Sequence, residues 1–79
     1  MSTSTPAARH PATTGLLRYF EYAHLPAHLR NISAPCAVLA REMADTLPDG
    51  LELTAGLRKL LEAKDCFVRA ALDLPNEPS

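Results

Sequence analysis

Two groups of side chains in this sequence could together bind a ligand that carries both flat rings and negative charge. The first group is aromatic and lies within one short segment: Tyr19, Phe20 and Tyr22, with His24 close by. The second joins a hydroxyl to two bases near the start of a predicted helix: Thr54, Arg58 and Lys59. Aromatic rings stack on nucleobases, and a helix N-terminus with bases beside it favours phosphates. These residue types therefore suit a nucleotide, although the rings equally suit a core or an interface, and the bases a plain charged surface.

The sequence contains no arrangement that is typical of a catalytic or metal site. It has no nucleophile elbow, no glycine-rich phosphate loop and no His–Cys pair at useful spacing. Cys36 and Cys66 lack the spacing of metal ligands and are predicted to be free thiols in a reducing compartment. His24 and His28 are four residues apart, but Pro26 between them prevents a shared helical face. We therefore expect a protein that is not an enzyme and that uses no cofactor.

The overall charge argues against a nucleic-acid partner. The chain has 79 residues and a formal net charge of −1, whereas proteins that bind long phosphate backbones are usually basic. A ligand with two or three phosphates needs only a few Lys or Arg residues, so small anions stay possible. No apolar stretch approaches the length that spans a bilayer. We expect neither DNA nor a membrane as a partner.

The composition divides the chain into an arm, a domain and a tail. Residues 1–15 are rich in Ser, Thr, Ala and Pro and show no apolar periodicity, which predicts a disordered N-terminal arm. Residues 16–74 are predicted to form the helical domain, and residues 75–79 a C-terminal tail. The aromatic segment from Leu16 to Pro26 fits either a short helix or a strand-like arm. Pro26 restrains Leu25 from helical geometry, so this segment is predicted to end in an extended or turn conformation.

A first long helix is predicted from about Ala27 to Thr46, directly after Pro26. Its apolar residues recur at steps of three and four: Leu29, Ile32, Cys36, Leu39 and Met43. Pro35 falls inside this helix, where it removes one backbone hydrogen bond and clashes with the carbonyl of Asn31. We therefore predict a kink or a break at this point.

A second long helix is predicted from the LPDG turn to about Asp73, ahead of Pro75. Asp49 and Glu52 have the spacing of a capping box at its start. The residues of one face recur as in the seam of a helix that packs on another helix: Leu53, Leu57, Leu60, Lys64, Phe67, Ala71 and Leu74. Lys64 is the charged member of this apolar seam, so it needs a partner that satisfies its ammonium group.

Two helices joined by so short a turn are predicted to be antiparallel neighbours. Counting back from the turn gives four pairs: Met43 with Leu57, Leu39 with Leu60, Cys36 with Lys64, and Ile32 with Phe67. Lys64 then lies near Pro35, and its ammonium group could donate a hydrogen bond to the carbonyl that the proline frees.

A two-helix hairpin of this length buries too little apolar surface to fold alone. The outer face of the first helix offers a strip of mostly small residues that lets another helix approach closely: Ala34, Ala37, Arg41 and Ala44. We therefore predict an all-α fold, an antiparallel two-helix hairpin with a short N-terminal arm or helix, which assembles as a homo-oligomeric helical bundle. A binding site would then lie where chains meet.

The order of several short motifs is similar to that of a family of small phage proteins. The matching pieces are YAHLP at residues 22–26, Ile32, Leu39-Ala40, Pro48, Glu52, Thr54, Leu57, Lys59-Leu60 and Glu62-Ala63. They align without obvious gaps from about His28 to Leu72. On these residues the chain resembles the cyclic-oligonucleotide sponges that share the helical hairpin of anti-CBASS and Thoeris anti-defence proteins.

The resemblance implies a function and a set of site residues. It implies a helical oligomer, often a hexamer, in the cytoplasm of an infected bacterial host. That oligomer would sequester cyclic di- or trinucleotides, or signals of the cyclic ADP-ribose type, without cleaving them. It implies that Tyr22 stacks on a base, with Thr54 and Lys59 as the hydroxyl and base of the second helix. The full predicted ligand-binding set is Tyr22, His24, Thr54, Arg58, Lys59 and Lys64.

The chain departs from the family pattern in the arm and at three later positions. The arm reads YAHLP where the family pattern has YHPP. Ser33 stands where many relatives have an arginine, Pro35 interrupts a helix, and Lys64 replaces an apolar residue. A lost arginine and a gained lysine predict an altered pocket, or none. The alternative function is an oligomeric helical-hairpin module that binds another protein and has no small-molecule ligand.

Overall fold

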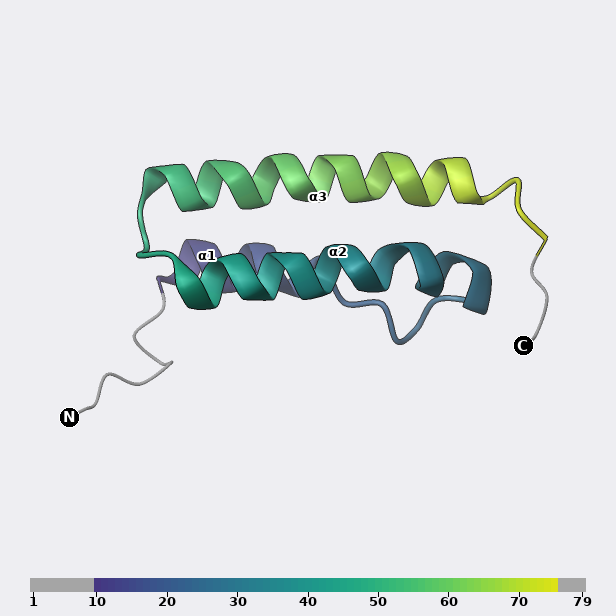
Figure 1. The fold of residues 1–79 in the computed structure, drawn as a ribbon, viewed down its shortest axis with the longest axis horizontal. Coiled ribbons are helices and arrows are strands. Elements are labelled where there is room, and N and C mark those ends of the chain that lie inside the picture. The colour runs from purple at the N-terminus through teal and green to yellow at the C-terminus, as the bar shows by residue number, and fades with distance from the viewer. Residues whose placement is uncertain (1–9, 76–79) are drawn as a thin grey trace.

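Three helices make up the part of the chain that the structure describes, residues 10–75 of a computed structural model. They are α1 (Pro11–Arg18), α2 (Ala27–Thr46) and α3 (Leu51–Ala71), and this part contains no strand. The two long helices run antiparallel, and α1 lies behind α2 in Figure 1. The all-α prediction is confirmed. The described residues form a three-helix unit, however, because α1 packs on both long helices.

Helix α1 begins five residues earlier than the predicted domain. Pro11 occupies its first helical position, and the Nδ1 atom of His10 accepts a hydrogen bond from the Ala12 N–H at 3.0 Å. The prediction of disorder for residues 1–15 is therefore wrong for residues 10–15, while residues 1–9 lie outside the described residues. The aromatic segment is split in two, since Leu16 to Arg18 belong to α1 and the rest of the segment is a loop.

Asp49 joins α1 to the turn between the long helices. Its carboxylate accepts a hydrogen bond from the His10 N–H at 2.8 Å and another from the Thr13 hydroxyl at 3.3 Å. Thr13 is fully buried. The predicted capping box is wrong, because α3 begins after Gly50, which has no side chain that caps it. The local spacing assigned the Asp49 carboxylate to the start of α3. It instead accepts hydrogen bonds from residues at the start of α1, 36–39 positions earlier in the chain.

Helix α2 runs unbroken through Pro35. Pro26 precedes its first residue, as predicted, and Pro35 lies on the exposed side of the helix. The predicted break is therefore wrong. Lys64 does not compensate for the proline, since its ammonium group pairs with the carboxylate of Asp65 at 2.8 Å.

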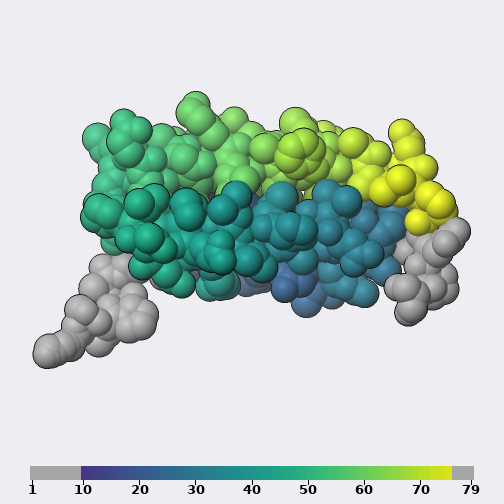
Figure 2. Space-filling model, viewed as in Figure 1, coloured from purple at the N-terminus to yellow at the C-terminus, as the bar shows by residue number. Residues whose placement is uncertain are grey.

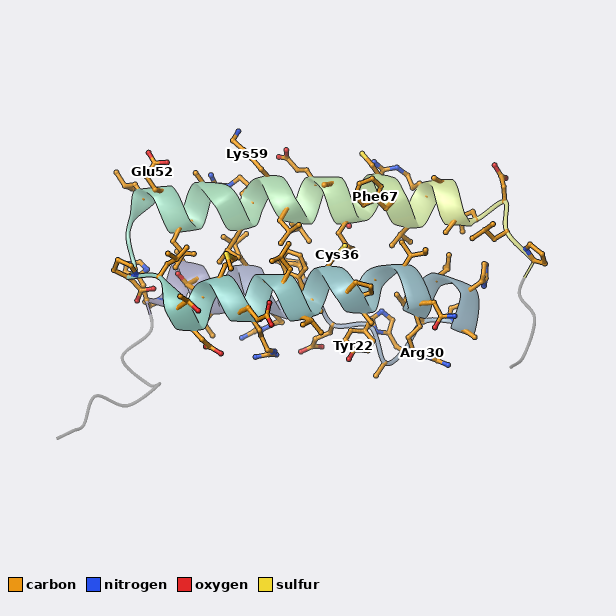
Figure 3. All side chains as sticks on the ribbon, viewed as in Figure 1. Tyr22, Arg30, Cys36, Glu52, Lys59 and Phe67 are labelled. Carbon is orange, nitrogen blue, oxygen red and sulfur yellow. The ribbon has the colours of Figure 1, made fainter. Side chains whose placement is uncertain are left out.

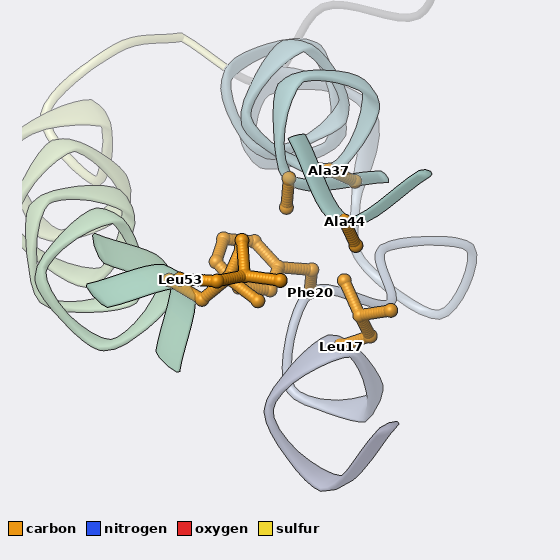
Figure 4. Close-up of a cluster of buried hydrophobic side chains, with 7 residues drawn as sticks. Leu17, Phe20, Ala37, Ala44 and Leu53 are labelled. Carbon is orange, nitrogen blue, oxygen red and sulfur yellow. The ribbon is translucent and has the colours of Figure 1, made fainter. Parts of the chain in front are cut away.

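The hydrophobic core lies where all three helices meet. Its buried members are Leu17, Phe20, Ala37, Ala40, Ala44, Leu53 and Leu57. Figure 4 looks along the helices and shows the labelled core side chains converging between α1, α2 and α3. The small side chains of α2 let the Phe20 ring approach that helix closely. The predicted outer strip is therefore wrong, since Ala37 and Ala44 are covered by this chain's own N-terminal segment.

Among residues 10–75, no further element covers the opposite side of the long pair. Figure 2 shows this broad side, with α2 and α3 in contact along its length. Several predicted seam residues are exposed there, among them Leu39 at 43% and Phe67 at 55%. None of the helices among residues 10–75 is long and apolar enough to cross a membrane.

Candidate functional site

The structure does not gather the six predicted ligand-binding residues in one place. Tyr22 and His24 lie in the loop between α1 and α2, and Thr54 and Arg58 lie near the start of α3. Lys59 is exposed on the outer side of α3. In Figure 3 the Tyr22 side chain lies beyond α2 and that of Lys59 points away from α2 on the other side of the molecule. Within one chain, Tyr22 and Lys59 do not face a common ligand.

The loop between α1 and α2 borders a cavity of about 480 Å³, here called the loop cavity. Its lining residues are Leu17, Phe20, Glu21, Tyr22, Ala23, His24, Ala37 and Arg41. The apolar part of this lining consists of side chains from α1, α2 and the loop that also belong to the core. The polar part of the lining comes from the loop and from α2. The volume falls within the range that small-molecule sites occupy, roughly 300–1,000 Å³.

Backbone hydrogen bonds hold the loop over this cavity. The Phe20 N–H donates to the Leu17 carbonyl at 3.0 Å, which carries the chain out of α1 in a tight turn. The Leu25 N–H donates to the Tyr22 carbonyl at 3.0 Å. The Arg30 guanidinium then donates to the Leu25 carbonyl at 2.8 Å and ties the loop to α2. Tyr22 is thus held by contacts on both sides of it in the sequence.

The polar groups of the loop cavity can bind a ring and an anion. Tyr22 is half-buried and offers an aromatic face, and Arg41 offers a planar guanidinium that can donate two parallel hydrogen bonds to a phosphate or carboxylate. Among the described residues, Arg41 forms no ion pair that would hold it away from a ligand. Glu21 also lines the cavity, and its carboxylate opposes a ligand with many negative charges.

The start of α3 forms a second hollow, of about 420 Å³. It is lined by His10, Ala12, Gly50, Leu51, Thr54 and Arg58. The Thr54 hydroxyl donates to the Gly50 carbonyl at 2.7 Å, so it is already used inside the helix. Arg58 is the one basic side chain of the predicted cluster that lines this hollow. The hydroxyl and the two bases therefore do not form a joint phosphate site.

Lys64 is engaged rather than available. Its side chain is 12% exposed, and its ammonium group forms an ion pair with Asp65. The Asp65 carboxylate beside the ammonium group would oppose a phosphate there.

Sequence reasoning missed Arg41 as a site residue. It placed Arg41 in a strip of small residues intended for a neighbouring helix, because the fold of the loop over α2 was not predicted. The only signal for Arg41 was a base among alanines on that strip. Within residues 10–75, no three His, Cys, Asp or Glu side chains are grouped to hold a metal ion.

Comparisons of this chain with models of protein families, with curated proteins and with solved structures give no match.

Proposed function

We propose that the protein binds a small cyclic nucleotide without cleaving it and thereby sequesters an immune signal in an infected bacterium. The ligand class is a cyclic di- or trinucleotide or a signal of the cyclic ADP-ribose type. The observation that carries the proposal is the loop cavity, where the Tyr22 ring and the Arg41 guanidinium line the same space. The motif resemblance between residues 22 and 63 supports the ligand class, and it supports a location in the bacterial cytoplasm.

The cavity suits a base and the phosphate next to it better than it suits two neighbouring phosphates. A base that stacks on Tyr22 would rest against the apolar surface of Leu17 and Ala37, and the adjoining phosphate would meet Arg41. His24 can donate a further hydrogen bond from the rim. Glu21 would disfavour a second phosphate close to the first. The proposed ligand-binding residues are therefore Tyr22, His24 and Arg41.

Calorimetry of the full chain with a panel of cyclic di- and trinucleotides and cyclic ADP-ribose isomers tests this proposal. Tyr22→Ala removes a stacking contact worth about 1–3 kcal/mol per base, so the Kd is expected to rise about 5- to 150-fold. Arg41→Ala is expected to have an effect of similar size. Thr54→Ala and Lys59→Ala are matched controls that should leave the Kd unchanged. Loss of binding in Lys59→Ala but not in Arg41→Ala would contradict this site.

Sequestration and cleavage are separated by recovering the ligand. Chromatography of the compound released by denaturation should return it intact in the amount that was bound. A degraded compound would overturn the proposal that the protein is not an enzyme.

The second candidate function is an oligomeric helical module that binds protein and no small molecule. The observation in its favour is the number of large apolar side chains exposed on the two long helices, including Leu39 and Phe67. The absence of binding to every member of the nucleotide panel, together with a stable complex through that surface, would favour this candidate over the first.

A further inference from the structure

We propose that a second copy of this chain docks on the side of the α2–α3 pair that α1 does not cover, here called the open face. The inference is independent of the proposed ligand, because none of the residues on which it rests lines the loop cavity. It also replaces the predicted contact strip, which the N-terminal segment covers.

The open face carries two apolar hollows. The turn-end hollow, of about 280 Å³, is lined by Leu39, Met43, Leu47, Glu52, Leu53, Gly56, Leu57 and Leu60. The far-end hollow, of about 410 Å³, is lined by Ile32, Phe67, Ala70, Ala71 and Leu74. Glu52 is the one charged residue among these linings. Depletion of charge is the compositional mark of the core of a protein interface.

Gly56 lowers the stability of α3, and no contact within residues 10–75 of the single chain explains why a glycine stands there. It lies in the interior of α3, where glycine lowers helix stability relative to alanine. A Cβ atom added at Gly56 would meet no atom within 4 Å, so no neighbour in the chain requires the missing side chain. Since Gly56 lines the turn-end hollow, the absence of a side chain there leaves room for a group from outside.

The broad side of the molecule is large enough to hold a stable dimer interface. The molecule extends 48 × 22 × 16 Å, and Figure 2 views it along the shortest of these directions. The outline in that direction is therefore about 1,000 Å² at most, and a standard interface needs about 800 Å² per partner.

The open face carries both an exposed ring and a hollow that could receive one, which is why its proposed occupant is a second copy. Phe67 is 55% exposed beside the far-end hollow, and the α3 residues that line the turn-end hollow lie 7 to 15 positions before it in the sequence. A two-fold axis that lies in the plane of the interface and crosses the long helices would place each Phe67 over the turn-end hollow of the other copy. Each contact would then be made twice, as in isologous interfaces.

Sedimentation equilibrium of the full chain, from low micromolar to several hundred micromolar, tests the proposal. We expect a dimer or an even multiple of it. Phe67→Glu and Gly56→Leu should each raise the dissociation constant at least 100-fold, and circular dichroism should show that both variants remain helical. Val38→Glu is the matched control for Phe67→Glu, because Val38 is similarly exposed, at 53%, and lines neither hollow.

A pair of glycine variants separates folding from association. Gly15 lies in α1 and likewise has no atom within 4 Å of an added Cβ. Both Gly15→Ala and Gly56→Ala should raise the thermal midpoint of the dilute chain. Only Gly56→Ala should also weaken association, by about tenfold. A monomer at every concentration, or an oligomer that Phe67→Glu and Gly56→Leu leave intact, would overturn the proposal.

Disulfide trapping tests the two-fold arrangement directly. In a background with Cys36→Ser and Cys66→Ser, one chain carries Leu39→Cys and the other carries Phe67→Cys. Mixing the two should give a cross-linked dimer under mild oxidation, and neither chain alone should do so. Cross-linking of each chain with itself but not with the other would contradict this arrangement.

Discussion

The two sides of the α2–α3 pair solve the same packing problem in different ways. On the side that α1 covers, α2 presents alanines, and the Phe20 ring and Leu17 fill the space that these small side chains leave. On the open face the large side chains belong to α2 and α3 themselves, and Leu39 and Phe67 stay exposed. A side chain in this fold is therefore buried where a large residue fits against a helix face of small residues. A large apolar side chain without such a facing surface stays exposed.

Replacing a phenylalanine on each side gives the largest expected contrast. Phe20→Ala removes a ring that is 2% exposed and should lower the free energy of unfolding by about 3–5 kcal/mol, much of the 5–15 kcal/mol typical of a domain. Phe67→Ala makes the same chemical change at a residue that is 55% exposed, and should cost about 1 kcal/mol or less in dilute solution. Urea denaturation at low protein concentration measures both. Equal losses would contradict the division into a covered and an open side.

Breaking the contact between α1 and the turn should have the next largest effect. Asp49→Ala removes the acceptor for the His10 N–H and for the buried Thr13 hydroxyl, and a buried donor left without a partner costs about 1–3 kcal/mol. Amide hydrogen exchange should show α1 losing protection while α2 keeps most of its own.

Two variants sharpen the Asp49 experiment. Thr13→Val in the Asp49→Ala background removes the orphaned hydroxyl and should recover part of the loss. Glu62→Ala changes an exposed carboxylate in mid-α3 and should stay within about 0.5 kcal/mol. Unchanged protection of α1 in Asp49→Ala would show that the carboxylate does not hold this helix.

Ser33→Ala should stabilise the covered side by about 1 kcal/mol. Ser33 is fully buried on α2, and its hydroxyl has no hydrogen-bond partner among the described residues. Thr54→Ala is the contrasting case, because the Thr54 hydroxyl is bonded to the Gly50 carbonyl, and its loss should slightly destabilise the chain. The thermal midpoint reports both signs, and a lower midpoint for Ser33→Ala would show that the hydroxyl has a stabilising partner.

Lys64→Leu should have the smallest effect, within about 0.5 kcal/mol of neutral. The Lys64 side chain is largely covered, but its ion pair is with Asp65, whose side chain is 47% exposed, and pairs near water contribute about 0–1 kcal/mol. Asp65→Asn, which leaves the ammonium group without its partner, should be the more harmful of the two. Chemical denaturation decides the order, and a loss above about 2 kcal/mol in Lys64→Leu would indicate a further buried partner.

The long helices were predictable because their signals are local. Pro26 before α2, the LPDG turn, and apolar residues at steps of three and four located both elements to within a few residues. A short N-terminal helix was among the predicted alternatives, but its start at Pro11 was missed. His10 and Pro11 are typical of a helix start, and the composition of residues 1–15 outweighed these two residues. The assignment of Asp49 to α3 failed for a related reason. Local spacing cannot show that a carboxylate will be used by a distant helix.

The candidate site was predictable only in part. The aromatic segment pointed to Tyr22 and His24, which do line the loop cavity. Arg41 could not be added to them from the sequence, because a loop that folds back over α2 leaves no periodic signal. Thr54, Arg58 and Lys59 lie close together in the sequence, but neighbouring residues of a helix point in different directions. Lys59 does not line the hollow at the start of α3, and the Thr54 hydroxyl is bonded to the Gly50 carbonyl. Arg58 is therefore the one of these three residues that offers an unbonded polar group to the hollow.

The sequence by itself determined that this chain is helical, where its two long helices lie, and that its formal net charge is −1. These follow from periodicity, turn residues and composition, which act over a few residues at a time or over the chain as a whole. Only the tertiary structure decided which side of the long pair is buried, which helix Asp49 holds, and which base meets Tyr22. Those outcomes depend on contacts between segments far apart in the chain, where the fit of Phe20 against three alanines outweighs the pattern of either helix alone.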